Sequence, residues 1–285
     1  MKNEEKYELV RLDPDIPVFM WLHPRGRTTN PRVIDAHWHR SLEFDIIWDD
    51  ELLYYINGVE YRLDGESVCL INSMDVHRLI PQSERKGPEI IGFTLIIGYD
   101  FLKSLVQDIE ESIFVLDGPE ETRAVRARLV KMADIFLAQA SPYWKAEIME
   151  QVCGLIYYLC SSCKHSRSVI PAHAETNVKE VRAMMEYIQE HYTEDIRQQE
   201  LSQRFFYSRE YMSKLFKRYT KCTIKEYLTQ YRLQQSERLL FHTDRSVTEI
   251  ALTVGFNDAK QMIRAFRRYY DMTPQQFRRS GHWKP

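Results

Sequence analysis

The sequence predicts an α+β protein with a β-rich N-terminal domain, a helical element after it and an all-α C-terminal domain. Three observations predict this division. The 285 residues exceed the length of one typical domain. Apolar residues alternate with a period of two from Val33 to about Tyr99, and they recur with helical spacing after Pro119. Of the 39 Lys and Arg, 20 lie in residues 177–285 with only 13 of the 41 Asp and Glu, so this part is basic and residues 1–176 are acidic.

Residues 33–99 contain short strand-like segments separated by turn signals, which is typical of a sandwich or barrel. The Asn57-Gly58 pair predicts a tight hairpin between two of them. The predicted strands are Ile34–His39, Leu42–Trp48, Glu51–Ile56, Val59–Leu63, Ser67–Ile71, His77–Ile80 and Ile90–Ile97. Before them, residues 1–35 are rich in proline and arginine, which predicts either an irregular arm that folds over a pocket or a plain leading strand.

Residues 119–163 have a helical period, and they predict two amphipathic helices at Glu121–Ala138 and Tyr143–Leu159. The apolar positions on their faces are Val125, Leu129, Met132, Phe136 and Leu137, then Ile148, Val152, Leu155, Ile156 and Leu159. Residues 164–176 lack periodicity and predict a linker. Asn177 then caps a helix that extends to His191 and begins the C-terminal domain, residues 177–285.

The segment from Ser246 to Phe277 carries the strongest local signals. Ser246 and Glu249 form a capping box, Gly255 can take the positive-φ turn that ends a helix, and Asp258 caps the next helix. A further helix start follows at Thr273-Pro274. A helix, a tight turn and a basic second helix form the layout of a helix-turn-helix, whose second helix lies in the DNA major groove.

A weaker copy of this segment lies about fifty residues earlier, with Leu201 matching Ile250 and Phe216 matching Phe266. Between the copies, a capping box at Thr223 opens a helix of about twenty residues. Such a helix is about 30 Å long, which is close to the roughly 34 Å between successive major-groove faces. The sequence therefore predicts two recognition helices about one DNA turn apart.

The segments L-S-x-x-F, Y-M-S-K-L-F-K-R, S-V-T-E-I-A-x-x-V-G-F-N-D and M-T-P-x-x-F-R occur in this order between residues 177 and 280. This arrangement resembles the DNA-binding domain of the AraC/XylS family of transcription factors. The chain differs at Phe206, where the family often has a small residue or one that tolerates left-handed backbone, and at Gln261-Met262, where Tyr-Phe is common. The resemblance implies a double helix-turn-helix, double-stranded operator DNA as a partner and, for an activator, contact with RNA polymerase.

In a helix-turn-helix, side chains on the first turns of the recognition helix read bases. The expected base readers are Arg209, Glu210, Ser213 and Lys214 in the first copy, and Lys260, Gln261 and Arg264 in the second. Basic side chains a turn later are expected to bind phosphates, and these are Lys217, Arg218, Arg267 and Arg268. The alternative for any single basic residue is a solvated helix face.

In the N-terminal domain, His37-x-His39-x-x-x-Glu43 and the later His77 resemble the motif of the cupin barrel, although Asn72-Ser73-Met74 stands where cupins usually have Pro and Gly. The resemblance implies a cupin-like sensing barrel over residues 1–118. Three alternatives remain open for the histidines: a small-molecule pocket, a metal site or structural side chains. We expect no metal or cofactor, and a pocket for an effector such as a sugar. Its expected lining is His37, His39, Glu43, Trp48, Tyr54, Arg62 and His77.

The helical element at residues 119–163 resembles the part of the family that forms a homodimer, and the alternative is that it covers the open end of the barrel. Five cysteines, an odd number, argue against a disulfide framework. No apolar run is long enough to span a membrane and the charged N-terminus lacks a signal core, so we expect a cytoplasmic protein. No catalytic motif is present, so we expect no enzyme. A metal-dependent cupin enzyme fused to a DNA-binding domain, and a regulator whose barrel only dimerises, remain alternatives.

Overall fold

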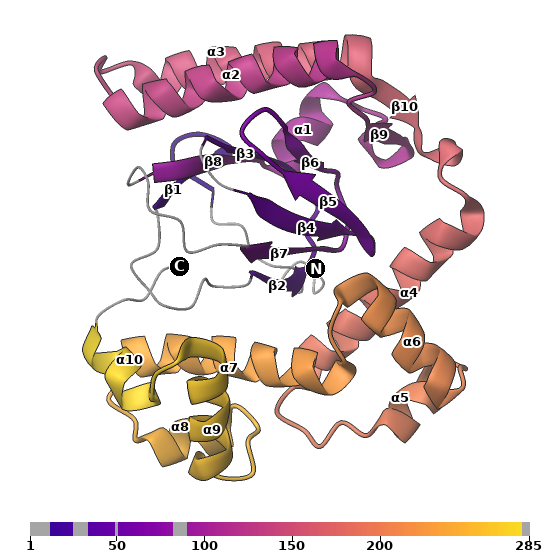
Figure 1. Cartoon of the computed structure of the whole chain (residues 1–285), viewed down its shortest axis with the longest axis vertical. Helices are drawn as coiled ribbons and strands as arrows, with labels where there is room; N and C mark the ends of the chain where they lie inside the picture. Colours follow the sequence, from indigo (N-terminus) through magenta and orange to yellow (C-terminus); the bar gives the residue numbers. More distant parts are fainter. Residues whose placement is uncertain (1–11, 25–33, 49–50, 82–89, 281–285) are drawn as a thin grey trace. The chain divides into compact units, whose positions relative to one another are not determined.

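The computed structural model describes residues 12–24, 34–48, 51–81 and 90–280. Contacts divide the chain into two units, Met1–Val178 and Lys179–Pro285, and each is described by itself. The described strands all belong to the first unit, whereas the second unit is helical (Figure 1). The mixed fold predicted from the sequence is therefore present as an N-terminal sheet region followed by a C-terminal helical domain.

Two four-stranded antiparallel sheets form the centre of the first unit. The first sheet has the order β1-β8-β3-β6, with β1 at Val18–Pro24, β8 at Ile90–Ile97, β3 at Leu42–Ile47 and β6 at Cys69–Ile71. The second has the order β2-β7-β4-β5, with β2 at Ile34–His37, β7 at His77–Pro81, β4 at Leu52–Ile56 and β5 at Val59–Leu63. The β4–β5 hairpin turns at Asn57 and Gly58, whose φ angles of 49° and 80° fit the type I′ turn favoured by Asn-Gly.

The seven strands predicted from alternation are confirmed as β2 to β8. Part of the predicted arm is also a strand, because β1 pairs with β8 from Val18 opposite Ile97, so the leading-strand alternative holds there. The arm positions 1–11 and 25–33 lie outside the described residues. The closed barrel is not found: within the described residues no ladder joins the two sheets. Alternation determines which face of a strand is buried, but it does not determine whether edge strands pair.

Strand β3 separates two apolar clusters. Its Phe44 and Ile46 lie in a cluster with two long helices, whereas Ile47 lies in a second cluster that joins side chains of both sheets. Side chains alternate along a strand, so Glu43 and Asp45 share the inter-sheet face with Ile47, and both are buried. Buried carboxylates need polar partners, so this face is a candidate binding site.

The two long helices are α2 (Pro119–Ala138) and α3 (Trp144–Tyr158), and they lie side by side over the first sheet (Figure 1). The short α1 (Tyr99–Leu105) precedes them. The predicted apolar faces of α2 and α3 are buried against the sheet at most positions, with the exception of Leu137, which is 61% exposed. None of the described helices has the length and hydropathy that a membrane crossing requires.

Residues 164–176 differ from the predicted linker. Lys164–Ser166 forms strand β10, which pairs with β9 (Ser112–Phe114). Helix α4 (Ala172–Glu190) begins five residues before the predicted cap, so Asn177 lies inside it. A three-residue strand has too few positions to show a period, and this is why the sequence pattern missed it.

The second unit contains two pairs of helices and one long helix that contacts both pairs. Its helices are α5 (Gln198–Arg204), α6 (Arg209–Thr220), α7 (Ile224–His242), α8 (Val247–Thr253), α9 (Ala259–Tyr270) and α10 (Pro274–Ser280). The predicted capping boxes at Thr223 and Ser246 are both present, and Asp258 caps α9 as predicted. These local signals fix the helix starts and therefore the positions of the side chains on α6 and α9.

Candidate functional site

The first candidate surface lies at the start of α6. Ser208 caps this helix, since its hydroxyl accepts a hydrogen bond of 3.2 Å from the backbone N–H of Tyr211. Buried Met212, Leu215 and Phe216 fix the inner face. The opposite face carries the predicted base readers: Arg209, Glu210 and Lys214 are exposed and Ser213 is half-buried.

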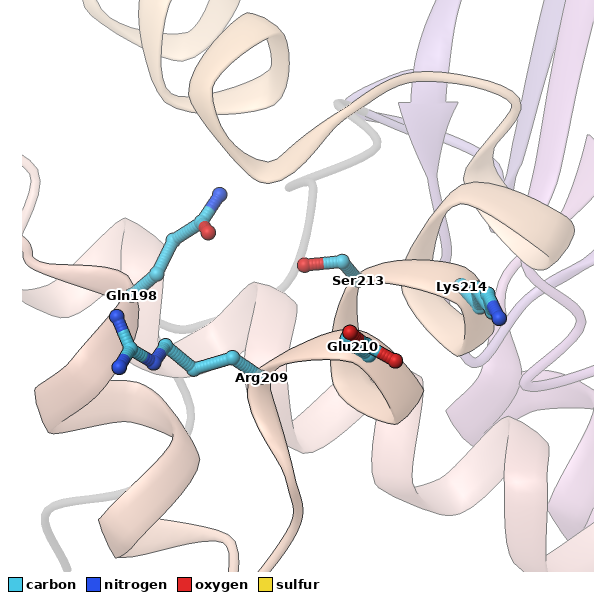
Figure 2. Close-up of a pocket in the computed structure, with 5 residues that line it drawn as sticks. All are labelled: Gln198, Arg209, Glu210, Ser213 and Lys214. Carbon is cyan, nitrogen blue, oxygen red and sulfur yellow. The ribbon is translucent and has the colours of Figure 1, made fainter.

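A pocket of about 610 Å³ opens on this surface. Its lining consists of Gln198, Arg209, Glu210, Ser213 and Lys214. Figure 2 shows Arg209 extending toward Gln198, with the Ser213 hydroxyl facing the same space. All four predicted readers of α6 thus lie together. Gln198 was not predicted, because the turn between α5 and α6 brings it there and no local pattern shows this.

Helix α9 presents a second basic surface, with Lys260 and Arg264 exposed. Gln261 is half-buried and takes part in the cap: its backbone N–H donates to Asp258 Oδ1 at 2.6 Å, and its Oε1 accepts from the Asn257 N–H at 3.1 Å. The side-chain oxygen of Gln261 therefore already accepts a hydrogen bond within the cap, whereas its side-chain N–H groups can donate to a base.

The four residues predicted to bind phosphate, Lys217, Arg218, Arg267 and Arg268, are all exposed. Arg268 also forms an ion pair of 3.7 Å with Glu226 at the start of α7. This pair joins α9 to the capping box of the long helix. Exposed cations on the sides of two helices form the kind of surface that phosphates attract.

The second candidate site lies between the sheets of the first unit. His37, His39, Glu43 and His77 each bring one potential ligand atom to within 4.8 Å of the others. His39 Nε2 is 2.7 Å from Glu43 Oε2, and His77 Nε2 is 3.6 Å from the same oxygen. His37 of β2 is directly opposite His77 of β7 in the ladder, and their ring centroids are 4.0 Å apart. Three segments of the chain therefore meet at the Glu43 carboxylate.

Burial and the neighbouring imidazoles set the charges of this cluster. Burial acts to raise the pKa of Glu43, but the interactions with His39 and His77 outweigh it and hold the pKa well below its usual range. Burial, together with the proximity of His37, lowers the pKa of His77 to about 4. The cluster thus contains a carboxylate beside a neutral imidazole at neutral pH.

Five of the seven predicted effector-binding residues face the inter-sheet core: the four of this cluster and Tyr54. Burial and the nearby Asp45 carboxylate raise the pKa of Tyr54 well above its usual range. Two predictions were wrong. Trp48 packs on the helix-covered side of the first sheet, and Arg62 is exposed, 3.2 Å from Glu51. Both follow from alternation, because each lies on the strand face opposite to the interior.

Asp45 was missed, although its spacing of two from Glu43 places it on the same strand face. It accepts a hydrogen bond from the Thr94 hydroxyl, which is itself 2.6 Å from His23 Nε2. Its Oδ2 atom is buried and has no hydrogen-bond partner in the part of the chain that the structure describes. Burial and the charge of Glu43 raise the pKa of Asp45 to about 6.

Three imidazoles and one carboxylate also form a donor set that suits divalent transition metals. One observation supports a metal at these four side chains: His77 Nε2 is buried and lacks a hydrogen-bond partner among the described residues. The four side chains are therefore able to hold a metal ion, whereas Tyr54 and Asp45 lie beside this donor set.

A family model described as a helix-turn-helix domain matches residues 201–280, which contain α6 to α10. The melibiose operon regulatory protein of Escherichia coli (strain K12) is 22% identical over 86% of this chain and 83% of its own length. The transcriptional activator RhaS of Salmonella schwarzengrund (strain CVM19633) is 24% identical over 85% and 86%. These matches make the chain similar, over most of its length, to transcriptional regulators of the AraC/XylS type. A solved structure, that of ToxT from Vibrio cholerae O395, covers 94% of this chain and 98% of its own with 13% identity and a TM-score of 0.45.

Two residues distinguish this chain from the pattern that is common in the AraC/XylS family. Phe206 adopts a left-handed φ of 57°, and its side chain is 94% exposed. Gln261 contributes to the cap of α9, while the adjacent Met262 is fully buried beside Phe266. The turn at Phe206 is thus formed without the residue types that usually make it.

Proposed function

We propose that this chain is a regulator of the AraC/XylS type and binds double-stranded operator DNA through two helix-turn-helix motifs, α5–α6 and α8–α9. The observation that carries the proposal is a repeated arrangement: α6 and α9 each have a capped start, a buried inner face and an exposed basic face. Helix α7 contacts both motifs, and its 19 residues span about 28 Å. This length approaches the roughly 34 Å of one DNA turn.

Within each motif, the first turns of α6 and α9 are proposed to read base edges. Arg209, Lys214, Lys260 and Arg264 can donate to guanine, and Glu210 can accept from cytosine. Ser213 and Gln261 are more restricted, because both are half-buried. Lys217, Arg218, Arg267 and Arg268 are proposed to bind phosphates, which adds affinity without base preference.

The first unit is proposed to be a cupin-like sensor for a small-molecule effector, such as a sugar or related metabolite. In support, His39, Glu43, Asp45, Tyr54 and His77 place polar atoms among the buried side chains between the sheets. Carboxylates and imidazoles can bind the hydroxyl groups of a polyol. One relative is named for the melibiose operon. Effector binding would change the packing of this unit. This change would in turn determine which pairs of DNA half-sites a dimer can span.

The dimer is proposed to form through the outer side of α2 and α3, where Leu137, Tyr143 and Tyr157 are exposed. Their inner faces are already used against the first sheet. A cytoplasmic homodimer of this kind would contact RNA polymerase if it activates transcription. The alternative function, a sensor unit that only dimerises, would use the same helices without an effector.

The DNA-binding proposal is tested by selecting duplexes from a random pool with the full chain and footprinting the selected sequence. Within each half-site we expect two protected segments centred about 10 base pairs apart on one face of the duplex. Lys214→Ala and Arg264→Ala should each relax the preference at one segment, whereas Lys131→Ala, an exposed cation of α2, should change neither. A pool without enrichment, or enrichment that both variants leave intact, would overturn the proposal.

A thermal-shift screen against sugars and organic acids, followed by footprinting, separates effector sensing from dimerisation alone. A ligand at 100 times its dissociation constant adds about 2.7 kcal/mol to the unit that binds it. A ligand that shifts the first unit and also alters the footprint supports the sensor. Identical footprints with and without every ligand that shifts the unit would favour dimerisation alone.

A further inference from the structure

We propose that the first unit binds one divalent transition-metal ion through the Nε2 atoms of His37, His39 and His77 and the carboxylate of Glu43. That the ion forms part of the effector site rests on the proposed function, whereas the ion binding itself does not. The inference follows from the positions of these four side chains, from the hydrogen bonds that orient the rings and from how the polar atoms of the cluster are paired.

The positions of the four ligand atoms fit one ion. Two donors that each lie about 2.1 Å from a metal are at most about 4.2 Å apart. The candidate atoms all lie within 4.8 Å of one another, which is close to this limit, so small side-chain shifts would bring them to a common centre. The ring centroids of the three histidines are 4.0 to 6.0 Å apart, which places three imidazoles around one point.

The hydrogen bonds at Nδ1 determine which ring nitrogen faces this centre. His37 Nδ1 is 2.8 Å from the Asp35 carbonyl oxygen, and His77 Nδ1 is 3.0 Å from the Asp75 carbonyl oxygen. His39 Nδ1 is 3.1 Å from the carbonyl oxygen of Ser41. A carbonyl oxygen only accepts, so each Nδ1 carries the proton and donates. In a neutral ring the lone pair is then on Nε2, and a hydrogen bond from Nδ1–H to an acceptor is the arrangement that metal-binding histidines use.

Without a cation, the cluster satisfies only some of its polar atoms. His39 Nε2 is 2.7 Å from Glu43 Oε2, and because a carboxylate only accepts, this hydrogen bond requires a proton on His39 Nε2. His77 Nε2 approaches the same oxygen only to 3.6 Å and has no hydrogen-bond partner among the described residues. A single divalent ion satisfies every donor at once.

A purely structural role leaves part of the cluster unexplained. His77 is 3% exposed, and its Nε2 atom has no hydrogen-bond partner in the described part of the chain. A buried polar atom without a partner costs free energy, so structural histidines are normally paired at both nitrogens. Imidazoles with one carboxylate favour Zn²⁺, Fe²⁺, Co²⁺ or Ni²⁺ over Mg²⁺ and Ca²⁺, which prefer oxygen ligands.

The test uses the full chain, stripped with a chelator and titrated with Co²⁺, whose visible absorption reports nitrogen coordination. Total metal is measured in the same samples by mass spectrometry. We expect the chain to bind one equivalent of Co²⁺ and the absorption band to saturate at that ratio. Co²⁺ or Zn²⁺ should raise the melting temperature, and added Mg²⁺ should not reduce the Co²⁺ band. Glu43→Gln and His37→Ala should each weaken Co²⁺ binding at least tenfold. His165→Ala should not, because His165 lies outside the cluster, beside Asp117.

Two variants keep the test decisive if one does not fold. Glu43→Gln preserves the shape of a buried side chain, and His37 is only half-buried, so circular dichroism of the stripped variants identifies a folded one. Absence of the band, or a band with equal affinity in the folded ligand variants, would overturn the metal site. Footprinting the same samples keeps the two proposals distinct. DNA binding without metal binding removes only the metal site, whereas metal binding without DNA binding removes only the proposed regulator.

Discussion

Phe206 and Gly255 occupy the same position in the two helix pairs, and both have left-handed backbone, with φ angles of 57° and 89°. The N–H of each donates to the carbonyl three residues earlier, Gln203 at 3.3 Å and Leu252 at 3.2 Å. The N–H of the following residue donates to the carbonyl five residues earlier in both copies. These are the two bonds of the Schellman motif, so a bulky residue and the smallest residue make the same turn.

Gly255→Ala is expected to lower the free energy of unfolding of the second unit by about 1–3 kcal/mol. Left-handed backbone costs a residue with a Cβ about 1–2 kcal/mol. In addition, the new Cβ would lie 2.7 Å from both the Tyr192 carbonyl oxygen and Thr193 Cα. Urea unfolding followed by helical circular dichroism measures the loss. Gly154→Ala in α3, whose new Cβ meets nothing within 4 Å apart from the neighbouring backbone of its own helix, should be neutral or stabilising, and equal losses would contradict the argument.

Phe206→Asn is expected to have the opposite sign and raise the stability of the second unit by up to about 1 kcal/mol. Asn tolerates left-handed backbone better than Phe does. The Phe206 side chain is 94% exposed, so its removal costs little burial. Phe206→Ala keeps the backbone strain and serves as the control in the same unfolding assay. If Asn and Ala lower the stability equally, Phe206 contributes packing that outweighs its strain.

The caps and turns of the second unit were predictable because their signals are local: Thr223 and Glu226, or Ser246 and Glu249, lie within one helical turn. The inter-sheet site was predictable in part, because the resemblance to the cupin motif brought His37, His39, Glu43 and His77 together, and the structure places these four side chains in one cluster. The predictions for Trp48 and Arg62 were wrong because they were based on the residue type and on closeness in sequence. The alternation of side chains along the strand places both residues on the face opposite to the interior. Barrel closure and the contribution of Gln198 depend on contacts between distant segments, and no short pattern carries that information.

Glu226 is expected to give the start of α7 a pH-dependent stability. Hydrogen bonds from the Thr223 backbone N–H and hydroxyl lower the pKa of Glu226 below its usual value. The folded-state pKa is depressed, so the stabilisation is present above about pH 4.5 and is lost as the pH falls through the folded-state pKa. Hydrogen exchange of α7 amides should therefore be faster in Glu226→Gln than in the wild type at pH 7, with the difference shrinking at acidic pH. A difference that grows at acidic pH would contradict this sign.

Arg264→Ala and Arg267→Ala are expected to weaken DNA binding in different ways. Arg264 lies on the reading face of α9, so its loss should cost about 1–3 kcal/mol on the selected sequence and relax the preference at one base position. Arg267, proposed to bind phosphate, should weaken all sequences about equally and reduce the salt slope by about one. Binding titrations on selected and scrambled duplexes at several salt concentrations separate the two. Equal effects of Arg264→Ala on both duplexes would remove it from the base readers.

Leu129 and Leu137 lie eight residues apart on α2, and their exposures separate the two roles proposed for this helix. Leu129 is fully buried against the first sheet, so Leu129→Ala should lower the free energy of unfolding of the first unit by about 2–5 kcal/mol. Leu137 is 61% exposed, so Leu137→Glu should leave the stability of the unit within about 0.5 kcal/mol. If the outer side of α2 forms the dimer, Leu137→Glu should instead shift sedimentation toward the monomer. A folded Leu137→Glu variant that remains dimeric would place the dimer contact elsewhere, because a charge at the centre of an apolar contact is not tolerated.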